Sequence, residues 1–249
     1  ILKDGLWDPY NNVAMGNCGE ILCKENKYTL DMQNSFAVES YKRSKAAIDK
    51  GFFNEEIVSV NVKNRSKDIL FDTDEEPLRF NKEKLMNLKP AFEKDGTITA
   101  GNASSLSDGA AALVLVSEEK VNELNLQPMA RIVGHTSFAT DPVYFTKAPI
   151  FSIKKLLTKL EMDINKIDLF EINEAFSCVT MVAMEELQIS HEKVNINGGA
   201  VSMGHPIGAS GARILVTLLY ALKARNLKYG VASLCIGGGE ASSVLVEMI

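Results

Sequence analysis

Several features that would assign a function class at once are missing from the sequence. Its four cysteines follow neither the spacing of a disulfide framework nor a C-x-x-C pair, which favours a reduced, intracellular protein. No apolar run approaches the roughly 18 residues that cross a bilayer, so we expect no membrane span. The formal net charge is -5, and nothing in it favours nucleic acid as a partner.

What is present is ordinary for a soluble globular protein. Hydrophobic residues make up 46% of the 249 residues and charged residues 24%, which allows one large domain or two smaller ones. The chain opens on Ile1 without a signal-like segment. We therefore expect a piece of a longer cytoplasmic or mitochondrial protein, with its targeting region not present.

The first 95 or so residues are polar and uneven. Thr29 is placed to cap a helix that ends before Gly51. Residues 55–64 alternate like a strand, and residues 72–84 read as a charged loop. No long internal repeat is visible.

From Thr97 onward, helical and strand-like segments alternate, which predicts a layered α/β domain. The apolar stretch Ala212–Ala224 is too hydrophobic for a surface helix, so we expect it between two layers. The predicted strands are 110–116, 167–172, 193–199 and a closing pair within 229–249 around a glycine turn. The predicted helices are 117–124, 149–162, 175–187 and 208–226.

Three glycine-flanked or polar stretches follow predicted strands: "NEAF" (173–176), "GHP" (204–206) and "CIGGGE" (235–240). Loops at strand ends are where α/β proteins place ligands. Together these loops would gather an amide, an imidazole, a thiol and backbone N–H groups. Such a set suits acyl chemistry, because an imidazole activates a nucleophile, a thiol moves a proton, and amide donors stabilise an oxyanion.

Simpler interpretations apply to the other candidates. His135 follows a strand and His191 lies in a loop, and "HEKVN" does not match the H-E-x-x-H zinc pattern. Cys23 and Cys178 read as inert core residues. Asn173 alone would also serve as a helix cap, and Glu174 is expected to orient its neighbours rather than to react.

The motifs "NEAF", "NINGGAVSMGHPIGASGARIL" and "CIGGGE", in this order, resemble those of the thiolase family, as do "TAGNASSLSDGAAALVL" and "KPAFEKDGT". The resemblance runs along the whole chain and is strongest to the biosynthetic branch. It implies a thiolase fold with layered αβαβα architecture and an α+β loop domain, with the N-terminal half-domain largely missing. The implied boundaries are 1–106 (loop domain), 107–127 (end of the N-terminal domain) and 128–249 (C-terminal domain).

The resemblance also implies roles for single residues. His205 would deprotonate the nucleophilic cysteine and bind a thioester oxygen, and Asn173 would hold a water that completes this oxyanion hole. Cys235 would exchange the α-proton of a second acetyl-CoA, and the N–H of Gly237 would serve the other oxyanion hole. The implied contacts to the pantetheine arm are Met15, Phe92, Ser104 and Phe176.

Two departures from the family matter. Its nucleophile lies upstream of where this chain begins, and none of the four cysteines stands in that motif; Cys18 aligns with a variable position. Many members have a histidine where this chain has Ala14. A potassium ion, bound in one subtype by main-chain oxygens and a tyrosine, would match Ala100, Gly101, Ala103, Val201 and Tyr41.

The implied activity is the condensation of two acetyl-CoA to acetoacetyl-CoA and its reversal, with no cofactor besides CoA as substrate. A degradative 3-ketoacyl-CoA thiolase and a non-catalytic, CoA-binding thiolase-like chain remain alternatives. Phe145 stands where side chains shape the acyl pocket, and its size favours short acyl groups, although a 2-methyl branch would fit. Family members are usually tetramers built from dimers.

Two other functions fit poorly. A serine hydrolase would need G-x-S-x-G, but Ala212 stands at the last glycine of "GASGA", so Ser210 is expected to begin the long helix. A dinucleotide fold would need G-x-G-x-x-G, which "GGGEAS" lacks. Several basic residues are expected to form a solvated face: Lys42, Arg43, Lys45, Arg65, Lys67 and Arg79. Of these, Arg79 is the candidate for contact with the 3′-phosphate of CoA.

Overall fold

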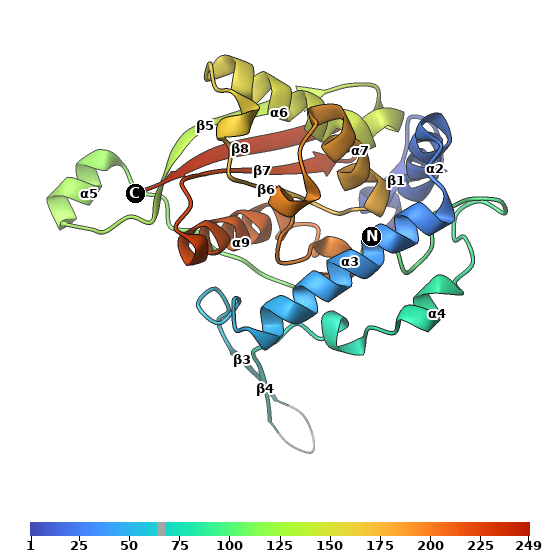
Figure 1. Cartoon of the computed structure of the whole chain (residues 1–249), viewed down its shortest axis with the longest axis horizontal. Coiled ribbons are helices and arrows are strands. Elements are labelled where there is room, and N and C mark those ends of the chain that lie inside the picture. Colours follow the sequence, from blue (N-terminus) through green and yellow to red (C-terminus); the bar gives the residue numbers. More distant parts are fainter. Residues whose placement is uncertain (64–67) are drawn as a thin grey trace.

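A four-stranded sheet forms the centre of the computed structural model, which describes residues 1–63 and 68–249 (Figure 1). Arg65 and Lys67 lie outside the described residues. The strand order is β5-β8-β7-β6; β6 runs parallel to β7, and β8 is antiparallel to β7 and β5. The carboxyl ends of β6 and β7 therefore share one edge. The bounds are β5 (Ala130–Ala139), β6 (Leu169–Ile172), β7 (Tyr229–Ile236) and β8 (Glu240–Met248).

Helices cover both faces of this sheet: α6 (Ala148–Lys159) and α7 (Ser177–Leu187) on one face, and α9 (Ser210–Arg225) on the other (Figure 1). Alternation along β6 sorts its side chains between them. Phe170 packs in the cluster that contains α6 and α7, whereas Leu169 packs in the cluster of α9. The predicted α/β class is confirmed, and the described residues form three of the five predicted layers.

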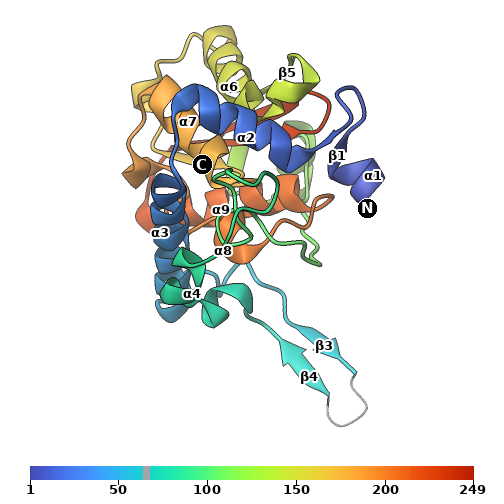
Figure 2. The same cartoon turned by 90° about the vertical axis from the view of Figure 1, so that its right-hand side faces the viewer.

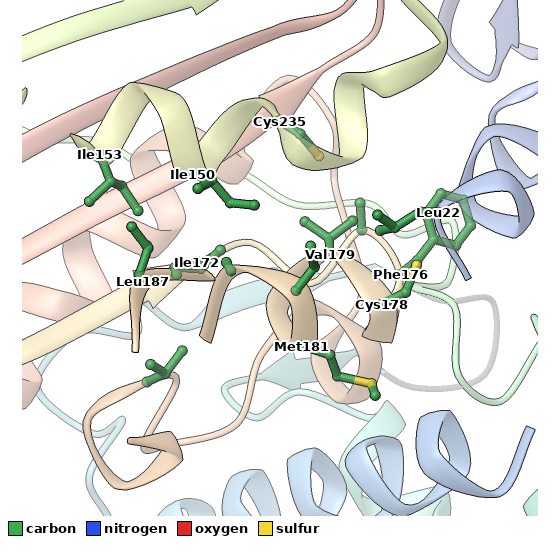
Figure 3. Packing of buried hydrophobic residues seen from close by; sticks show 14 of the residues in the cluster. Leu22, Ile150, Ile153, Ile172, Phe176, Cys178, Val179, Met181, Leu187 and Cys235 are labelled. Carbon is green, nitrogen blue, oxygen red and sulfur yellow. The ribbon is translucent and has the colours of Figure 1, made fainter. Parts of the chain in front are cut away.

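The larger core lies between the sheet and the pair α6 and α7 (Figure 3). Ile153 and Ile172 are fully buried there, and Val179 of α7 packs with them. Cys235 belongs to the same cluster, so the end of β7 is anchored in this core. Burying side chains of this kind contributes about 1.5–3 kcal/mol each to folding.

The N-terminal third packs onto this body. Helix α2 (Met15–Asn26) contacts α7 and η2 (Pro142–Lys147), and α3 (Leu30–Asp49) contacts α7 and α8 (Ala200–Met203). Thr29 caps α3 through its side chain, which accepts a hydrogen bond from Met32 N (3.2 Å), as predicted. The hairpin of β3 (Val60–Val62) and β4 (Ile69–Phe71) projects from the body (Figure 2).

The remaining elements are short, and none of the described helices combines the length and the apolar character of a membrane span. Their bounds are α1 (Leu2–Gly5), β1 (Trp7–Asp8), β2 (Val13–Ala14), η1 (Glu76–Arg79), α4 (Lys82–Met86), α5 (Glu118–Leu124), η3 (Ile164–Lys166) and η4 (His191–Lys193).

Two predicted strands are wrong. Residues 110–116 form no strand, because no described strand lies beside them to pair with; Val114 is 94% exposed. Residues 193–199 make only isolated bridges, since Asn195 and Gly198 adopt positive φ (+48° and +84°) and interrupt an extended run. The Asn195 side chain bonds instead to the backbone N–H and C=O of Ile172 (2.8 Å each).

Other boundaries shift. Only Val60–Val62 of the expected strand 55–64 pairs among the described residues, and the expected loop 72–84 contains η1 and the start of α4. His135 lies within β5 rather than after a strand. The sheet covers one face of α9. The opposite face, which carries Leu215, Val216 and Tyr220, is half-buried. The described residues therefore do not form the second layer that was expected to cover this helix.

Candidate active site

Backbone hydrogen bonds hold the "NEAF" and "GHP" loops against one extended segment. Ser104 donates to the carbonyl of Ala175 from both N (3.1 Å) and Oγ (2.9 Å). His205 N donates to the carbonyl of Ser105, the next residue (3.1 Å). Residues 104–105 therefore lie beside two loops that are about 70 and 100 residues further along the chain.

Asn173 and His205 are in direct contact. Asn173 follows β6 at the sheet edge, where its backbone N donates to the carbonyl of Ser233 (2.9 Å). Its side chain is 1% exposed, and its Nδ2 lies 3.3 Å from His205 Nε2. The structure therefore brings together the predicted amide and imidazole.

The other imidazole nitrogen is held by Ser210, a contact that the sequence analysis missed. Ser210 begins α9, as predicted, and its Oγ lies 2.5 Å from His205 Nδ1. The same Oγ donates to the carbonyl of Pro206 (3.1 Å). Because Ser210 is fully buried, its hydroxyl orients the imidazole and is not placed to attack a substrate. Only the five-residue spacing within "HPIGAS" hinted at this contact.

His205 stays neutral at physiological pH. Burial, and secondarily the nearby charge of Arg213, lower its pKa from 6.5 to about 4. A neutral imidazole has one basic nitrogen. It is therefore available as a proton acceptor at pH 7.

Glycines in this region serve close packing more than open space. A Cβ on Gly204, which has φ +88°, would lie 2.0 Å from Ser107 Oγ. A Cβ on Gly199 would lie 2.3 Å from the carboxyl carbon of Glu174. Gly208, by contrast, has no atom within 4 Å of the position of a Cβ. These glycines let the loop that carries His205 run directly against neighbouring chain segments.

Glu174 organises the loops without facing the imidazole. Its carboxylate accepts hydrogen bonds from Ser40 Oγ (2.7 Å), Asn195 Nδ2 (2.9 Å) and Val201 N (3.1 Å). Burial raises its pKa above the usual value, and the three donors oppose that shift. This is the orienting role expected for Glu174.

Cys235 lies near the end of β7, the strand parallel to β6. Since Ile172 pairs with Ser233, Asn173 and Cys235 end neighbouring strands at one sheet edge. The Cys235 thiol is 7% exposed, and burial raises its pKa to about 12. In the described part of the chain, no hydrogen bond joins it to Asn173 or His205.

The glycine turn after Cys235 contacts a predicted substrate residue. A Cβ on Gly237 would lie 2.8 Å from Met15 Cε, so Met15 lies directly against this turn. Phe92 meets Phe176 edge to face, with ring centroids 6.1 Å apart. Met15 and Phe176 share the cluster of Cys235 (Figure 3 shows Phe176 and Cys235).

The remaining predicted residues lie in different environments. Phe145, in η2, is 4% exposed and packs in the larger core. Arg79 is exposed and pairs with Glu75 (2.8 Å) and Glu76 (3.8 Å). An exposed arginine with two carboxylate partners has to exchange them to reach a phosphate.

The other three thiols are not placed for chemistry on a substrate. Cys18 is fully buried 4.0 Å from a carboxylate oxygen of Asp8, and burial together with that charge raises its pKa to about 11. Cys23 and Cys178 are core residues with at most 1% exposure, as predicted.

The residues predicted for potassium offer oxygen ligands of the right kind. The carbonyls of Ala100, Gly101, Ala103 and Val201 accept no hydrogen bond within the described part of the chain. Gly101 lies against Leu85, which shares a small core cluster with Val201, and Tyr41 packs against this cluster. Unpaired carbonyls suit a hard cation. No group of His, Cys, Asp and Glu with metal-binding geometry occurs among residues 1–63 and 68–249.

Curated relatives match the whole chain. It is 46% identical to "Probable acetyl-CoA acetyltransferase" of Dictyostelium discoideum and 49% identical to "Acetyl-CoA acetyltransferase 2" of Arabidopsis thaliana. Both alignments cover 100% of the chain and 60% and 62% of the relatives. The chain thus spans about three fifths of their length.

Solved structures of similar proteins superpose on this chain over nearly its whole length. The acetyl-CoA acetyltransferase of Bacillus anthracis superposes with a TM-score of 0.95 at 44% identity, over 98% of this chain and 62% of that one. Acat5 thiolase from Ascaris suum, in complex with coenzyme A, gives 0.93 at 43% over 99% and 63%. Human mitochondrial 3-ketoacyl-CoA thiolase gives 0.92 at 36% over 98% and 62%.

The family models cover nearly every residue. The model of the thiolase N-terminal domain matches residues 1–119, and that of the thiolase C-terminal domain matches residues 126–248. Together with the relatives, they confirm the resemblance read from "NEAF", "GHP" and "CIGGGE". The chain belongs to the thiolase family and has the thiolase fold.

Proposed function

We propose that the protein is an acetyl-CoA C-acetyltransferase, which condenses two acetyl-CoA to acetoacetyl-CoA and catalyses the reverse thiolysis. The observation that carries the proposal is the 3.3 Å contact between Asn173 Nδ2 and His205 Nε2, at the sheet edge where Cys235 also ends its strand. The names of the relatives support acetyl as the acyl group.

In the first half-reaction, a cysteine thiol from a part of the protein outside this chain would give its proton to Nε2 of His205. The thiolate then attacks the thioester carbonyl; the new C–S bond forms as the C–S bond to CoA breaks. Once protonated, His205 Nε2–H and Asn173 Nδ2–H are two donors 3.3 Å apart, or Asn173 acts through a bound water. Both arrangements stabilise one oxyanion.

Cys235 would handle the other protons. Because burial raises its pKa to about 12, its resting form is the thiol, which protonates the departing CoA thiolate. The resulting Cys235 thiolate is a strong base and removes the α-proton of a second acetyl-CoA. The carbanion attacks the acyl-cysteine, forms the C–C bond and expels the nucleophilic thiolate, which takes its proton back from His205. The N–H of Gly237 would serve the other oxyanion hole.

The substrate arm would lie along an apolar wall. Met15 at the glycine turn and the edge-to-face pair Phe92 and Phe176 supply its surface, and Ser104 supplies a polar group beside the "NEAF" loop. Arg79 would meet the 3′-phosphate after releasing Glu75. An Ascaris suum thiolase of the same fold was solved in complex with coenzyme A, which supports this class of ligand.

Further properties are proposed from the resemblance. Potassium would bind the free carbonyls of Ala100, Gly101, Ala103 and Val201, with Tyr41 nearby, and would stabilise the loop that carries Ser104. We expect a homotetramer built from dimers. The compartment is cytoplasmic or mitochondrial; the relatives from Xenopus include proteins named mitochondrial.

The second candidate is a degradative 3-ketoacyl-CoA thiolase. The fold admits it, since the human enzyme of that name superposes well. Phe145 is the feature that separates the two, because a buried aromatic ring beside the core shortens an acyl pocket. Its truncation to alanine should therefore admit longer 3-ketoacyl chains.

The test uses the protein expressed with its complete coding sequence. Thiolysis of acetoacetyl-CoA and of 3-ketohexanoyl-CoA is compared for wild type and for His205→Ala. We expect turnover of the four-carbon substrate that depends on His205. Preference for the six-carbon substrate would favour the degradative enzyme. Binding of CoA without turnover of either would favour a non-catalytic chain.

A further inference from the structure

Arg213 contacts Asn173 from the side opposite His205. It lies in the first turn of α9, and its Nη2 donates to Asn173 Oδ1 (3.4 Å). Its Nη1 is buried and has no hydrogen-bond partner among the described residues. Burying a guanidinium nitrogen without a hydrogen-bond partner costs free energy. A cation at this position therefore needs an explanation.

The chemistry of the guanidinium dictates the direction of every hydrogen bond beyond it. Arginine has donors only, so the Asn173 atom that faces it must be the carbonyl oxygen. The atom that faces His205 is then the NH₂ group, which donates. Nε2 of His205 must accept, so the imidazole proton sits on Nδ1 and is donated to Ser210 Oγ. The Ser210 hydroxyl completes the chain at the carbonyl of Pro206, which only accepts.

We infer that Arg213 is a positioning residue for His205: through Asn173 it fixes the imidazole in the tautomer whose Nε2 is unprotonated and faces the substrate side. This series of hydrogen bonds begins at the guanidinium of Arg213, which can only donate, and ends at the carbonyl of Pro206, which can only accept. Both ends therefore impose the same direction on every hydrogen bond between them. The inference rests on the proposed function, because a basic Nε2 has a use only if His205 accepts a proton there.

The surroundings explain why a cation is retained at this place. Three carboxyl groups lie near Arg213: Glu171, two residues before Asn173 on β6, is buried, Glu56 is half-buried, and Asp74 is exposed. Burial raises the pKa of Glu56 to about 7 and raises the pKa of Glu171 as well, while the charge of Arg213 opposes both shifts. Glu56 is itself tied to α9 by Thr217 (3.0 Å). Arg213 is thus the cation that favours the ionised forms of these carboxyl groups, which gives a reason for its retention beside Asn173.

The tautomer can be read directly. The chain has three histidines, so ¹⁵N-histidine labelling and a long-range ¹H–¹⁵N correlation resolve each ring, with His205→Gln to assign the signals. At neutral pH we expect His205 to carry its proton on Nδ1. A proton on Nε2 in the wild-type chain would overturn the inference without any variant.

The contribution of Arg213 is isolated by replacing Ser210, which holds His205 at the opposite end of this series of hydrogen bonds. In Ser210→Ala we expect the Nδ1–H tautomer to persist, because Arg213 still orients Asn173. In Ser210→Ala/Arg213→Met it should become a mixture of tautomers, and Ser210→Ala/Arg213→Lys, with another acceptor-free cation, should restore it. Ser210→Ala/Arg225→Met is the matched control, because Arg225 lies on the same helix and bonds to Asn197 (3.1 Å).

The outcomes separate the alternatives. An unchanged tautomer in the Ser210→Ala/Arg213→Met variant, or an equal change in the Arg225 control, would show that Arg213 supports the fold only. If the double variant does not fold, Arg213→Met alone decides by the population of the Nδ1–H tautomer of His205, which should fall below that of the wild type and stay unchanged in Arg225→Met. Since no turnover is measured, an inactive protein with the expected tautomer would contradict the proposed function and leave this inference standing.

Discussion

Asn173 Nδ2 lies 3.3 Å from His205 Nε2, although 32 residues separate them in sequence. If both serve one oxyanion, their effects on catalysis cannot be independent. We expect Asn173→Ala and His205→Ala each to lower kcat for acetyl transfer by about 10²–10³, and the double variant to lose little more than the stronger single variant. The measurement is steady-state thiolysis of acetoacetyl-CoA by the complete protein.

The matched control for this cycle is His135→Ala, in β5 and outside the site. It should retain the wild-type kcat. If the reduction in kcat of the double variant equals the product of the two single reductions, Asn173 and His205 act on different atoms. That result would contradict a shared oxyanion hole.

Cys235→Ser should separate the two half-reactions. Serine has the same shape but a far less acidic hydrogen, so it is a poor proton shuttle. Acylation of the nucleophile, followed by mass spectrometry, should persist at a reduced rate, whereas formation of acetoacetyl-CoA should fall by about 10² or more. Cys23→Ser, a core thiol elsewhere, should keep both steps. Loss of acylation itself in Cys235→Ser would mean that the roles are misassigned.

Gly204→Ala tests the backbone of the histidine loop. Alanine at φ +88°, with its Cβ 2.0 Å from Ser107 Oγ, should lower the free energy of unfolding by about 1–3 kcal/mol and displace His205. Gly208→Ala, four residues on, meets nothing within 4 Å and should change thermal stability by a fraction of that amount. Equal Tm values for the two variants would contradict the close packing described for this loop.

Buried neutral histidine predicts how stability depends on pH. The pKa of His205 is about 4 in the folded chain against 6.5 unfolded, so between these values the unfolded chain binds more protons. Stability from this group is therefore full above about pH 6.5 and is lost as pH falls toward 4, by up to about 3 kcal/mol. The difference between wild type and His205→Gln in urea unfolding at pH 7 and pH 4.5 isolates this contribution. A difference that does not change with pH would contradict it.

Local chemistry made part of this architecture readable from the sequence. The Thr29 cap, the helix that starts at Ser210 and the hairpin at the C-terminus carry their own signals in capping residues, periodicity and glycine. The "NEAF" and "GHP" motifs predicted a meeting of amide and imidazole, which the structure bears out at 3.3 Å. These predictions succeeded because each depends on neighbours in sequence or on motifs with fixed chemistry.

The failures involve partners that no local pattern specifies. Residues 110–116 have the composition of a buried strand, but a strand forms only where another backbone pairs with it. Asn195 interrupts the expected strand 193–199 with a positive φ that its own side-chain bonds stabilise. The contacts of Ser210 and Arg213 with the site likewise appear only when α9 is docked on the sheet.

The central claim is that Asn173, His205 and Cys235 act around one thioester. A crystal structure of the complete protein with acetyl-CoA tests it most directly. We predict the thioester oxygen within about 3.2 Å of His205 Nε2, with Asn173 as second donor directly or through one water, and the Cys235 sulfur facing the acetyl methyl group. A thioester bound away from His205, or a Cys235 thiol still enclosed in the core and turned from the acetyl group, would contradict it.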